Sequence, residues 1–273
     1  MSVPTKIDLL LSDVDGTLVP KNKELSPATI AAAKALHAAG IGLTFTSARP
    51  PRGMRMLIEP LRLKLPLGGF NGGLIVDTDF SVLERHPNDP YAAEEAVKLI
   101  VECGLDLWVY TENDWLVSDP EGPHVAREAW IIEMSAIARV PAPADLAQAF
   151  KIVGVSDDHE KIAKAAKLAE ARLGDTVSAS CSNPYFLDIT HPKANKGAVV
   201  HTLAARLGLS SAQIATIGDG ANDVLMFAQS GFSIAMGNAS ADVKTHASAE
   251  TSSNEEDGWA KAIKKFLLTA HRL

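Results

Sequence analysis

The sequence has few cysteines, no long apolar run and no excess of positive charge, and each absence excludes a class of protein. Its two cysteines, Cys103 and Cys181, lie far apart and form no C-x-x-C pair, so neither a disulfide framework nor a structural zinc site is expected. No apolar stretch approaches the roughly 20 residues that span a bilayer. The segment from Met1 to Lys6 lacks the basic and apolar pattern of a secretory signal. We therefore expect a cytoplasmic protein with no membrane partner.

The charge balance argues against nucleic acid as a partner. The chain carries 33 Asp and Glu against 26 Lys and Arg, which gives a formal net charge of −7. A surface of this sign repels polyanions on average. A small phosphate ester remains an acceptable ligand, because a bound divalent cation can be the largest charge in its site.

The chain is long enough for one large domain or two of modest size, with 273 residues of which 47% are hydrophobic. Towards both ends, short apolar runs alternate with stretches of helical period, and this alternation predicts a parallel sheet with helical crossovers. The predicted strands are 7–11, 41–45, 214–217 and 232–235. The predicted helices are 27–39, 52–61, 196–207, 222–229 and 258–271, the first with Ser26 as N-cap and a stop at Gly40.

The middle of the chain has a different texture. Helix-like stretches alternate there with shorter strand-like ones, and Trp108, Trp115 and Trp130 all fall in this region. We expect an α+β domain inserted into a discontinuous α/β domain with a Rossmann-like parallel sheet. The predicted limits are 1–82 and 188–273 for the core domain and 83–187 for the insert. Within the insert the predicted helices are 91–102, 125–134 and 160–172, and the predicted strands are 105–110, 115–117, 151–155 and 176–179.

The run Asp13-Val14-Asp15-Gly16-Thr17-Leu18 directly follows the first predicted strand. It places two carboxylates two residues apart at the carboxyl end of that strand, where open α/β sheets bind their ligands. Asp13 could attack phosphorus, and Asp15 could protonate the leaving oxygen and later activate water. Two acidic residues in a turn are weak evidence alone, because most such turns are simply solvated.

A second acidic loop, Gly218-Asp219-Gly220-Ala221-Asn222-Asp223, also follows an apolar strand. If the two strands are neighbours, both loops meet at one edge of the sheet. Clustered carboxylates raise one another's pKa unless a cation intervenes, and oxygen ligands favour Mg²⁺ over zinc or copper. We therefore expect a magnesium site, and protonation of Asp15 would bring it close to neutrality when no substrate is bound.

Two further residues complete the predicted site. Ser47 follows the second strand, and Lys196 begins a predicted helix. A hydroxyl and an ammonium group can hold the non-bridging oxygens of a phosphoryl group. Each residue also has an ordinary explanation, as a strand end or a solvated helix position, and Lys193 competes with Lys196 for the role.

The order D-x-D-G-T-L, hydroxyl residue, lysine and G-D-G-x-N-D resembles the four motifs of the haloacid dehalogenase superfamily of phosphatases, in particular its Cof-type branch. The runs Phe70-Asn71-Gly72-Gly73, Met236-Gly237-Asn238-Ala239 and Asn254-Glu255-Glu256-Asp257-Gly258 add to the resemblance. Members of this branch mostly hydrolyse sugar phosphates and similar small phosphomonoesters. The resemblance implies Mg²⁺ as cofactor and a small phosphorylated metabolite as partner, and a monomer and a homodimer both remain open.

The resemblance also implies roles for individual residues. Asp13 would be nucleophile and metal ligand, and Asp15 the acid/base, with a backbone carbonyl on Mg²⁺. Lys196 is preferred to Lys193, because the lysine of the family is followed by glycine. The other implied roles are phosphate binding for Ser47 and Lys196, metal binding for Asp219 and, directly or at one remove, Asp223, and substrate binding or ordering of the site for Arg49, Asn71 and Asn222.

The insert follows the second motif, which resembles a C2-type cap that closes over the core and chooses the leaving group. Three alternatives stay open. A phosphotransferase or mutase of the same superfamily usually carries a small cap before the second motif, where this chain has room for one helix only. A phosphoacceptor module of the receiver type would be about half this length and would lack Asp15. A non-catalytic phosphometabolite-binding relative would be expected to lack motif residues.

Overall fold

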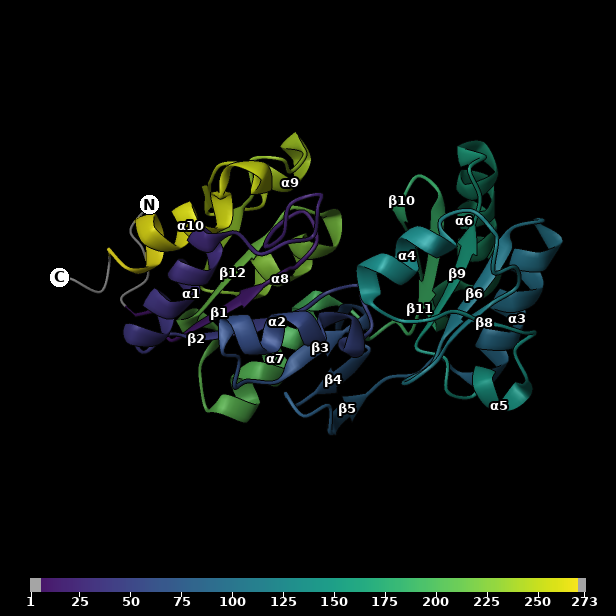
Figure 1. Cartoon of the computed structure of the whole chain (residues 1–273). Helices are drawn as coiled ribbons and strands as arrows, with labels where there is room; N and C mark the ends of the chain where they lie inside the picture. The colour runs from purple at the N-terminus through teal and green to yellow at the C-terminus, as the bar shows by residue number, and fades with distance from the viewer. Residues whose placement is uncertain (1–5, 270–273) are drawn as a thin grey trace.

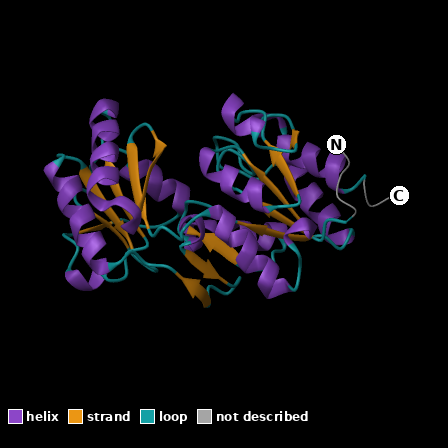
Figure 2. Ribbon diagram, turned by 180° about the vertical axis from the view of Figure 1, so that it is seen from behind, coloured by secondary structure: helices purple, strands orange, loops and turns teal. Residues whose placement is uncertain are grey.

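Two sheet-centred domains make up the structure, a computed structural model that describes residues 6–269 (Figure 1). One domain contains both ends of the described chain, and the other, drawn in teal in Figure 1, is formed by the middle of the sequence. Helices flank both central sheets (Figure 2). None of the helices within residues 6–269 has the length and apolarity needed to cross a membrane. The α/β core with an inserted α+β domain confirms the predicted fold class.

The core domain is built on a five-stranded parallel sheet with the order β14-β13-β12-β1-β2. The side chains of β1 alternate between its two faces. Leu10 packs in one cluster with Leu36 and Trp259, whereas Leu9 and Leu11 pack in another. Burial on both faces explains why the strand is an almost unbroken apolar run. The strand bounds are β1 Leu9–Ser12, β2 Gly42–Phe45, β12 Ile214–Gly218, β13 Phe232–Ala235 and β14 Ala249–Glu250.

The helices of the core domain follow the capping signals of the sequence. Ser26 accepts a hydrogen bond from the Thr29 amide, and Pro27 occupies the first helical position, where its missing N–H costs nothing. The bounds are α1 Pro27–Ala38, α2 Arg55–Leu61, α7 Lys196–Leu207, α8 Val224–Gln229, α9 Ala241–Thr245 and α10 Gly258–Ala262.

Three predicted helices of the core domain begin or end with a 3₁₀ or π-helical turn. The predicted helix 52–61 begins as a 3₁₀ turn over Pro51–Met54, and the helix 222–229 begins as one over Ala221–Asp223. The last helix, predicted as 258–271, continues from α10 as a π-helical turn over Ile263–Leu267, and its predicted end lies outside the described residues. Short 3₁₀ turns at helix ends are common, and the helical period of the sequence does not reveal them.

The inserted domain contains a six-stranded sheet with the order β10-β11-β9-β6-β7-β8. Leu107 and Val109 of β6 pack into the cluster that includes residues of α3 and α6, whereas Trp108 and Tyr110 belong to the cluster shared with the core domain. The strands are β6 Asp106–Tyr110, β7 Trp115–Val117, β8 Ile137–Ala138, β9 Lys151–Val155, β10 Ser178–Asn183 and β11 Phe186–Thr190; the helices are α3 Pro90–Glu102, α4 Val125–Ile132, α5 Pro143–Leu146 and α6 His159–Leu173.

A small antiparallel sheet, which the sequence did not predict, lies beside the core. It consists of β3 Leu67–Gly69, β4 Leu74–Val76 and β5 Val82–Arg85, strands too short to show a clear period of two. The expected domain limit after residue 82 cuts β5, and the limit after residue 187 cuts β11, which pairs with β9 and β10 of the inserted sheet. We propose instead that the domains join after Arg85 and after Thr190.

Aromatic rings connect the two domains. Phe70, from the loop between β3 and β4, stacks on Phe150 of the inserted domain with ring centroids 5.6 Å apart and planes inclined by 4°. Its ring also lies 6.0 Å from that of Tyr110. Gly53 of the core packs against Ile132 at the end of α4 so closely that an added Cβ would lie 3.0 Å from the Ile132 side chain. The inserted domain is therefore packed onto the core through α4 and the Tyr110 face of its sheet.

Candidate active site

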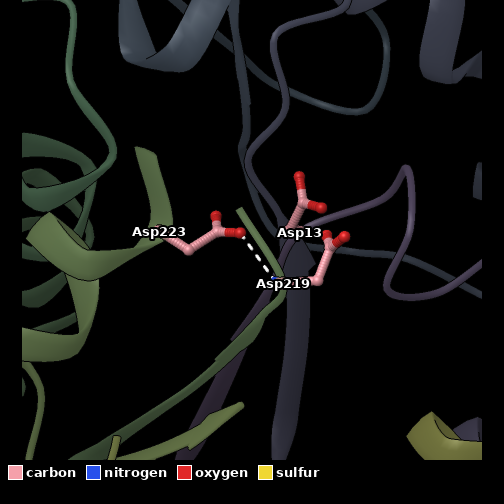
Figure 3. Close-up of side chains that lie close together, drawn as sticks. All are labelled: Asp13, Asp219 and Asp223. Carbon is pink, nitrogen blue, oxygen red and sulfur yellow. Dashed lines mark hydrogen bonds between the residues drawn. The ribbon is translucent and has the colours of Figure 1, made fainter. Parts of the chain in front are cut away.

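Two loops at the carboxyl edge of the core sheet bring three aspartates together. Asp13 follows β1, Asp219 follows the neighbouring strand β12, and the Asp13 amide donates to the Ile217 carbonyl at 3.0 Å. Carboxylate oxygens of Asp13, Asp219 and Asp223 all lie within 4.8 Å of one another. Figure 3 shows the carboxylates of Asp13 and Asp219 next to each other, with Asp223 approaching from the following loop. The two acidic motifs, more than two hundred residues apart, thus form one site.

Lys196 lies at the centre of this cluster. Its Nζ is 2.6 Å from Asp13 Oδ1 and 2.6 Å from Asp223 Oδ1. The side chain is only 1% exposed, and it begins α7, whose N-cap Asn195 accepts a hydrogen bond from the Ala198 amide. Burial alone would lower the pKa of Lys196, but the two carboxylates raise it above its usual value, so the ammonium group stays charged. Lys193, the competing lysine, is exposed.

A hydrogen-bonded loop holds Asp219 in place. The Thr17 hydroxyl donates to Asp219 Oδ1 at 3.1 Å, and Asn238 Nδ2 donates to Asp219 Oδ2 at 3.0 Å and to the Gly16 carbonyl at 2.8 Å. Gly16 has φ +79°, and a Cβ there would collide with the Asp219 carboxylate. Only glycine fits this position without strain, because both the backbone conformation and the close approach exclude a side chain.

The crowded carboxylates have raised pKa values. Burial, opposed by Lys196 and reinforced by Asp223 and Asp219, raises the pKa of Asp13 to about 8. Burial and the charge of Asp223 likewise raise the pKa of Asp219 to about 6. One ammonium group therefore does not compensate these carboxylates. A hard divalent cation between Asp13 and Asp219 would supply the missing charge, and an all-oxygen donor set of this kind suits Mg²⁺.

Asp223 is the least available of the three aspartates for a metal ion. Its Oδ1 accepts from Lys196, and its Oδ2 accepts from the amides of Asp219 and Gly220 at 2.9 and 2.8 Å. The residue is fully buried. These bonds hold the Asp219 loop and Lys196 in position, so the geometry favours support of the site at one remove over direct metal binding.

Asp15 lies outside this cluster and is held by two cations. Arg49 donates from Nε to Asp15 Oδ2 at 2.6 Å and from Nη2 to Oδ1 at 2.7 Å, and Lys23 Nζ lies 2.5 Å from Oδ1. Burial alone would raise the pKa of Asp15, but the hydrogen bonds and charge of Arg49, followed by those of Lys23, lower it to about 2. The expectation that Asp15 is protonated in the substrate-free site is therefore wrong, because two cations hold its ionised form.

Arg49 also ties the site to the inserted domain. Its Nη1 donates to the Gly53 carbonyl at 3.0 Å and to the Ile131 carbonyl, near the end of α4, at 2.9 Å. The Ile131 carbonyl belongs to the last turn of the helix, where carbonyl groups lack helical partners. One buried guanidinium group thus contacts Asp15 and both domains.

The remaining predicted residues lie around the site in different ways. Ser47, 1% exposed, lines the cavity over the aspartates, and its hydroxyl accepts a hydrogen bond from the Arg49 amide at 3.2 Å. Asn222 also lines the cavity and donates from Nδ2 to Asn71 Oδ1 at 3.1 Å. Asn71 itself, in the left-handed conformation at φ 57°, reaches the site only through this contact with Asn222 and does not line the cavity.

The cavity has a volume of about 390 Å³ and lies between the two domains. Asp13, Asp219 and Lys196 form part of its core wall. The wall contributed by the inserted domain consists of His124, Arg127, Glu128 and Ile131 from α4 and its N-cap, with Lys151, Asn183, Tyr185 and Phe186 from the sheet and its turns. A molecule bound there would be enclosed by side chains from both domains.

Sequence reasoning missed several of these residues. Lys23 has no motif around it, and only its contact with Asp15 reveals it. The sequence assigns no role to Asn238, although its run Met236-Gly237-Asn238-Ala239 resembles the family, and its hydrogen bond to Asp219 gives it one. On the α4 wall, the spacing of His124, Arg127, Glu128 and Ile131 is that of a single helix face, but the sequence does not show what that face meets.

Replacing Lys196 tests its place in the cluster. Lys196→Met leaves Asp13 and Asp223 buried without their shared cation, so we expect the free energy of unfolding in urea to fall by about 3–5 kcal/mol. The matched control is Lys193→Met, an exposed lysine three residues earlier, which should change it by no more than about 0.5 kcal/mol. Equal effects of the two substitutions would contradict the arrangement.

The raised pKa values predict how metal-free stability depends on pH. Because the folded pKa values of Asp13 and Asp219, about 8 and about 6, exceed the usual 3.8, the folded protein binds more protons than the unfolded chain between these limits. The thermal midpoint in chelator should therefore fall as pH rises from about 5 to about 8. Added Mg²⁺ should raise it more at pH 8 than at pH 5, because metal competes with protons for the carboxylates.

In Asp13→Asn the thermal midpoint in chelator should fall less steeply with pH, because only one of the two carboxylates, that of Asp219, still titrates. A midpoint that falls equally in both proteins, or a Mg²⁺ effect that is larger at pH 5, would contradict the assignment.

Comparisons with known proteins agree with this geometry. The family described as haloacid dehalogenase-like hydrolase matches residues 10–263. The chain is 28% identical over 230 residues to a protein of Cronobacter sakazakii named HMP-PP phosphatase, covering 83% of each. It is 26% identical over 263 residues to the Bacillus subtilis protein named 5-amino-6-(5-phospho-D-ribitylamino)uracil phosphatase YcsE, covering 96% of each.

A solved structure extends the agreement to the fold. A haloacid dehalogenase-like hydrolase from Bacteroides thetaiotaomicron superimposes with a TM-score of 0.87 at 26% identity, covering 95% of this chain and 99% of that one. The similarity therefore includes the inserted domain as well as the core. With the four motifs gathered at one sheet edge and the family matched over almost the whole chain, this protein belongs to the haloacid dehalogenase-like hydrolases, and its named relatives are phosphatases.

Proposed function

We propose that the protein is a Mg²⁺-dependent phosphatase that hydrolyses small phosphomonoesters through a phosphoaspartyl intermediate on Asp13. The observation that carries this proposal is the position of Asp13. Its Oδ1 is fixed by Lys196 at 2.6 Å, it lies beside Asp219, and it lines the cavity between the domains. A carboxylate fixed in this way can approach a phosphorus atom in line with the leaving oxygen.

Asp13 and Asp219 are the side chains that would hold the magnesium ion, with Asp223 supporting them through Lys196 and the Asp219 loop. When bound, Mg²⁺ would keep Asp13 ionised and neutralise charge on the phosphoryl oxygens. The donor set contains carboxylate oxygen only, which is why we prefer Mg²⁺ to a softer metal.

The phosphoryl group would be held by residues of three loops. Lys196 is the buried cation closest to Asp13, and the Ser47 hydroxyl offers a hydrogen bond from the end of β2. Arg49 and Lys23 line the same cavity but are bound to Asp15 before substrate arrives. A phosphate dianion would compete with Asp15 for these two cations.

This competition would give Asp15 its acid function. Arg49 and Lys23 lower the pKa of Asp15 against the opposing effect of burial, so their transfer to phosphate would let burial raise it. Protonated Asp15 would then donate to the leaving oxygen as the bond from Asp13 to phosphorus forms. The resulting carboxylate would take a proton from the water that attacks phosphorus, which releases inorganic phosphate and restores protonated Asp15.

Small esters fit the enclosed volume of the site better than large ones. A cavity of about 390 Å³ bounded by both domains accommodates a metabolite and not a folded macromolecule. Relatives named for the hydrolysis of phosphorylated metabolites support this choice, but their particular substrates do not transfer to this chain. The four motifs do not indicate which residues of the inserted domain would select the leaving group, because all four lie in the core domain.

Substitution of Asp13 tests the proposal. We expect the native protein with Mg²⁺ to release phosphate from p-nitrophenyl phosphate, and a chelator to abolish this activity. Asp13→Asn should reduce kcat by about a thousandfold or more, because the amide is a poor nucleophile. Asp242→Asn, an equal charge change at an exposed position of α9, is the control and should retain activity. Full activity of Asp13→Asn would refute the mechanism, and native protein that binds phosphate esters without hydrolysing them would favour the non-catalytic alternative.

A further inference from the structure

One face of α4 forms much of the cavity wall that the inserted domain contributes. His124, Arg127, Glu128 and Ile131 all line the cavity, at the spacing of successive turns on one helix face. This wall belongs to the inserted domain, whereas Asp13, Asp219 and Lys196 belong to the core, so it would meet the part of a substrate that leaves with the ester oxygen. The properties of these four residues therefore bear on which leaving groups fit.

Three of the four residues are held by contacts within the protein. His124 stacks on Tyr185 with ring centroids 4.0 Å apart, and its Nε2 lies 2.8 Å from Asp157 Oδ1. Glu128 accepts a hydrogen bond from the Tyr110 hydroxyl at 3.1 Å. The Ile131 carbonyl accepts from Arg49.

Arg127 differs from the other three. Its side chain is exposed and has no hydrogen-bond or ion-pair partner among residues 6–269. The adjacent Glu128 forms no ion pair with it, and its carboxylate instead accepts the hydrogen bond from the Tyr110 hydroxyl.

The other lysines and arginines of the cavity are all paired. Lys196 lies between Asp13 and Asp223, Arg49 and Lys23 hold Asp15, and Lys151 Nζ lies 3.1 Å from the buried Asp188 Oδ2. In the described part of the chain, Arg127 is thus the one lysine or arginine of the cavity that forms no ion pair with a carboxylate. It lies in the inserted domain and forms no ion pair with Asp13, so a phosphoryl group held at Asp13 by Lys196 would leave it available.

We propose that Arg127 is a specificity-determining residue that binds a second anionic group, a carboxylate or a second phosphate, on the leaving group of the substrate. This inference rests on the proposed phosphatase function. A planar guanidinium group can bind either anion through two parallel hydrogen bonds, which favours such substrates over neutral ones of the same length. The preferred substrates would therefore be phosphorylated acids or bisphosphates, and neutral phosphorylated alcohols would be poorer.

Matched pairs of substrates test the inference. We would compare 3-phosphoglycerate with glycerol 3-phosphate, 4-phosphoerythronate with erythritol 4-phosphate, and 6-phosphogluconate with glucitol 6-phosphate, which differ only by a carboxylate in place of a hydroxymethyl group. Fructose 1,6-bisphosphate and fructose 6-phosphate form the arm that tests a second phosphate. The expected result is a kcat/KM at least about tenfold higher for the anionic member of one or more pairs.

Arg127→Gln should abolish that preference, mainly by raising KM for the anionic member, and it should lower kcat/KM for the neutral partner and p-nitrophenyl phosphate far less. Arg127→Lys should retain part of it, because charge remains but paired hydrogen bonding does not. The matched control is Arg172→Gln, the same charge change on α6 outside the cavity, where Arg172 pairs with Glu102.

Two results would overturn the inference. One is native enzyme that hydrolyses p-nitrophenyl phosphate without a preference in any pair. The other is an equal loss for all substrates in Arg127→Gln, which would indicate general attraction of anions. Both leave the proposed function intact, whereas failure of native enzyme to hydrolyse any substrate, p-nitrophenyl phosphate included, would overturn the function and the inference together.

Discussion

The contact of Lys196 with Asp13 and Asp223 is the interaction on which the rest of the site depends. It places one ammonium group at 2.6 Å from each of two carboxylates in the interior of the core domain. Taking three charged groups out of water is costly, and good geometry with further hydrogen bonds is needed to offset that cost. The contact joins the loop after β1, the start of α7 and the loop after β12, which are far apart in sequence. The parallel sheet brings these segments to one edge, and the buried ion pairs fix how they meet there.

A second group of charges, around Asp15, connects this site to the cap. Arg49 is bound to Asp15, to the Gly53 carbonyl of the core and to the Ile131 carbonyl of α4. The site therefore contains two carboxylates in opposite electrostatic environments. Burial and neighbouring carboxylates raise the pKa of Asp13, whereas Arg49 and Lys23 lower that of Asp15. A metal ion beside Asp13 would lower the pKa of Asp13 and so favour its nucleophilic, ionised form. A phosphate dianion that binds Arg49 and Lys23 would raise the pKa of Asp15 and so favour its acidic, protonated form.

The sequence predicted the parts of the structure that local rules govern. The apolar run before Asp13 predicted a buried strand, Ser26 and Pro27 predicted the start of α1, and the helix predicted over 196–207 matches α7. The meeting of Asp13 with Asp219 also followed from sequence, because loops after neighbouring parallel strands share one edge. The preference for Lys196 over Lys193 rests on the family resemblance. It is consistent with the structure, in which Lys196 is buried and Lys193 is exposed.

What escaped prediction depends on contacts between distant side chains. The sequence does not predict the charge state of Asp15, because no local pattern shows that Lys23 and Arg49 both contact its carboxylate. The short strands β3, β4 and β5 escaped because three or four residues show no clear period. The wall that α4 presents to the cavity, with Arg127 unpaired, follows from how the cap packs on the core, and no local pattern reports that packing.

Covalent phosphorylation of Asp13 is the central step of the proposed mechanism, and trapping the phosphorylated enzyme tests it most directly. Asp15→Asn retains the nucleophile but lacks the base that activates water, so the phosphoenzyme should accumulate from an aryl phosphate, whose leaving group needs little acid catalysis. Acid quenching with Mg²⁺ present, followed by peptide mass spectrometry, should locate the phosphoryl group on Asp13. Stoichiometric release of nitrophenol while Asp13 remains unmodified, or a phosphoryl group on another residue, would contradict the account.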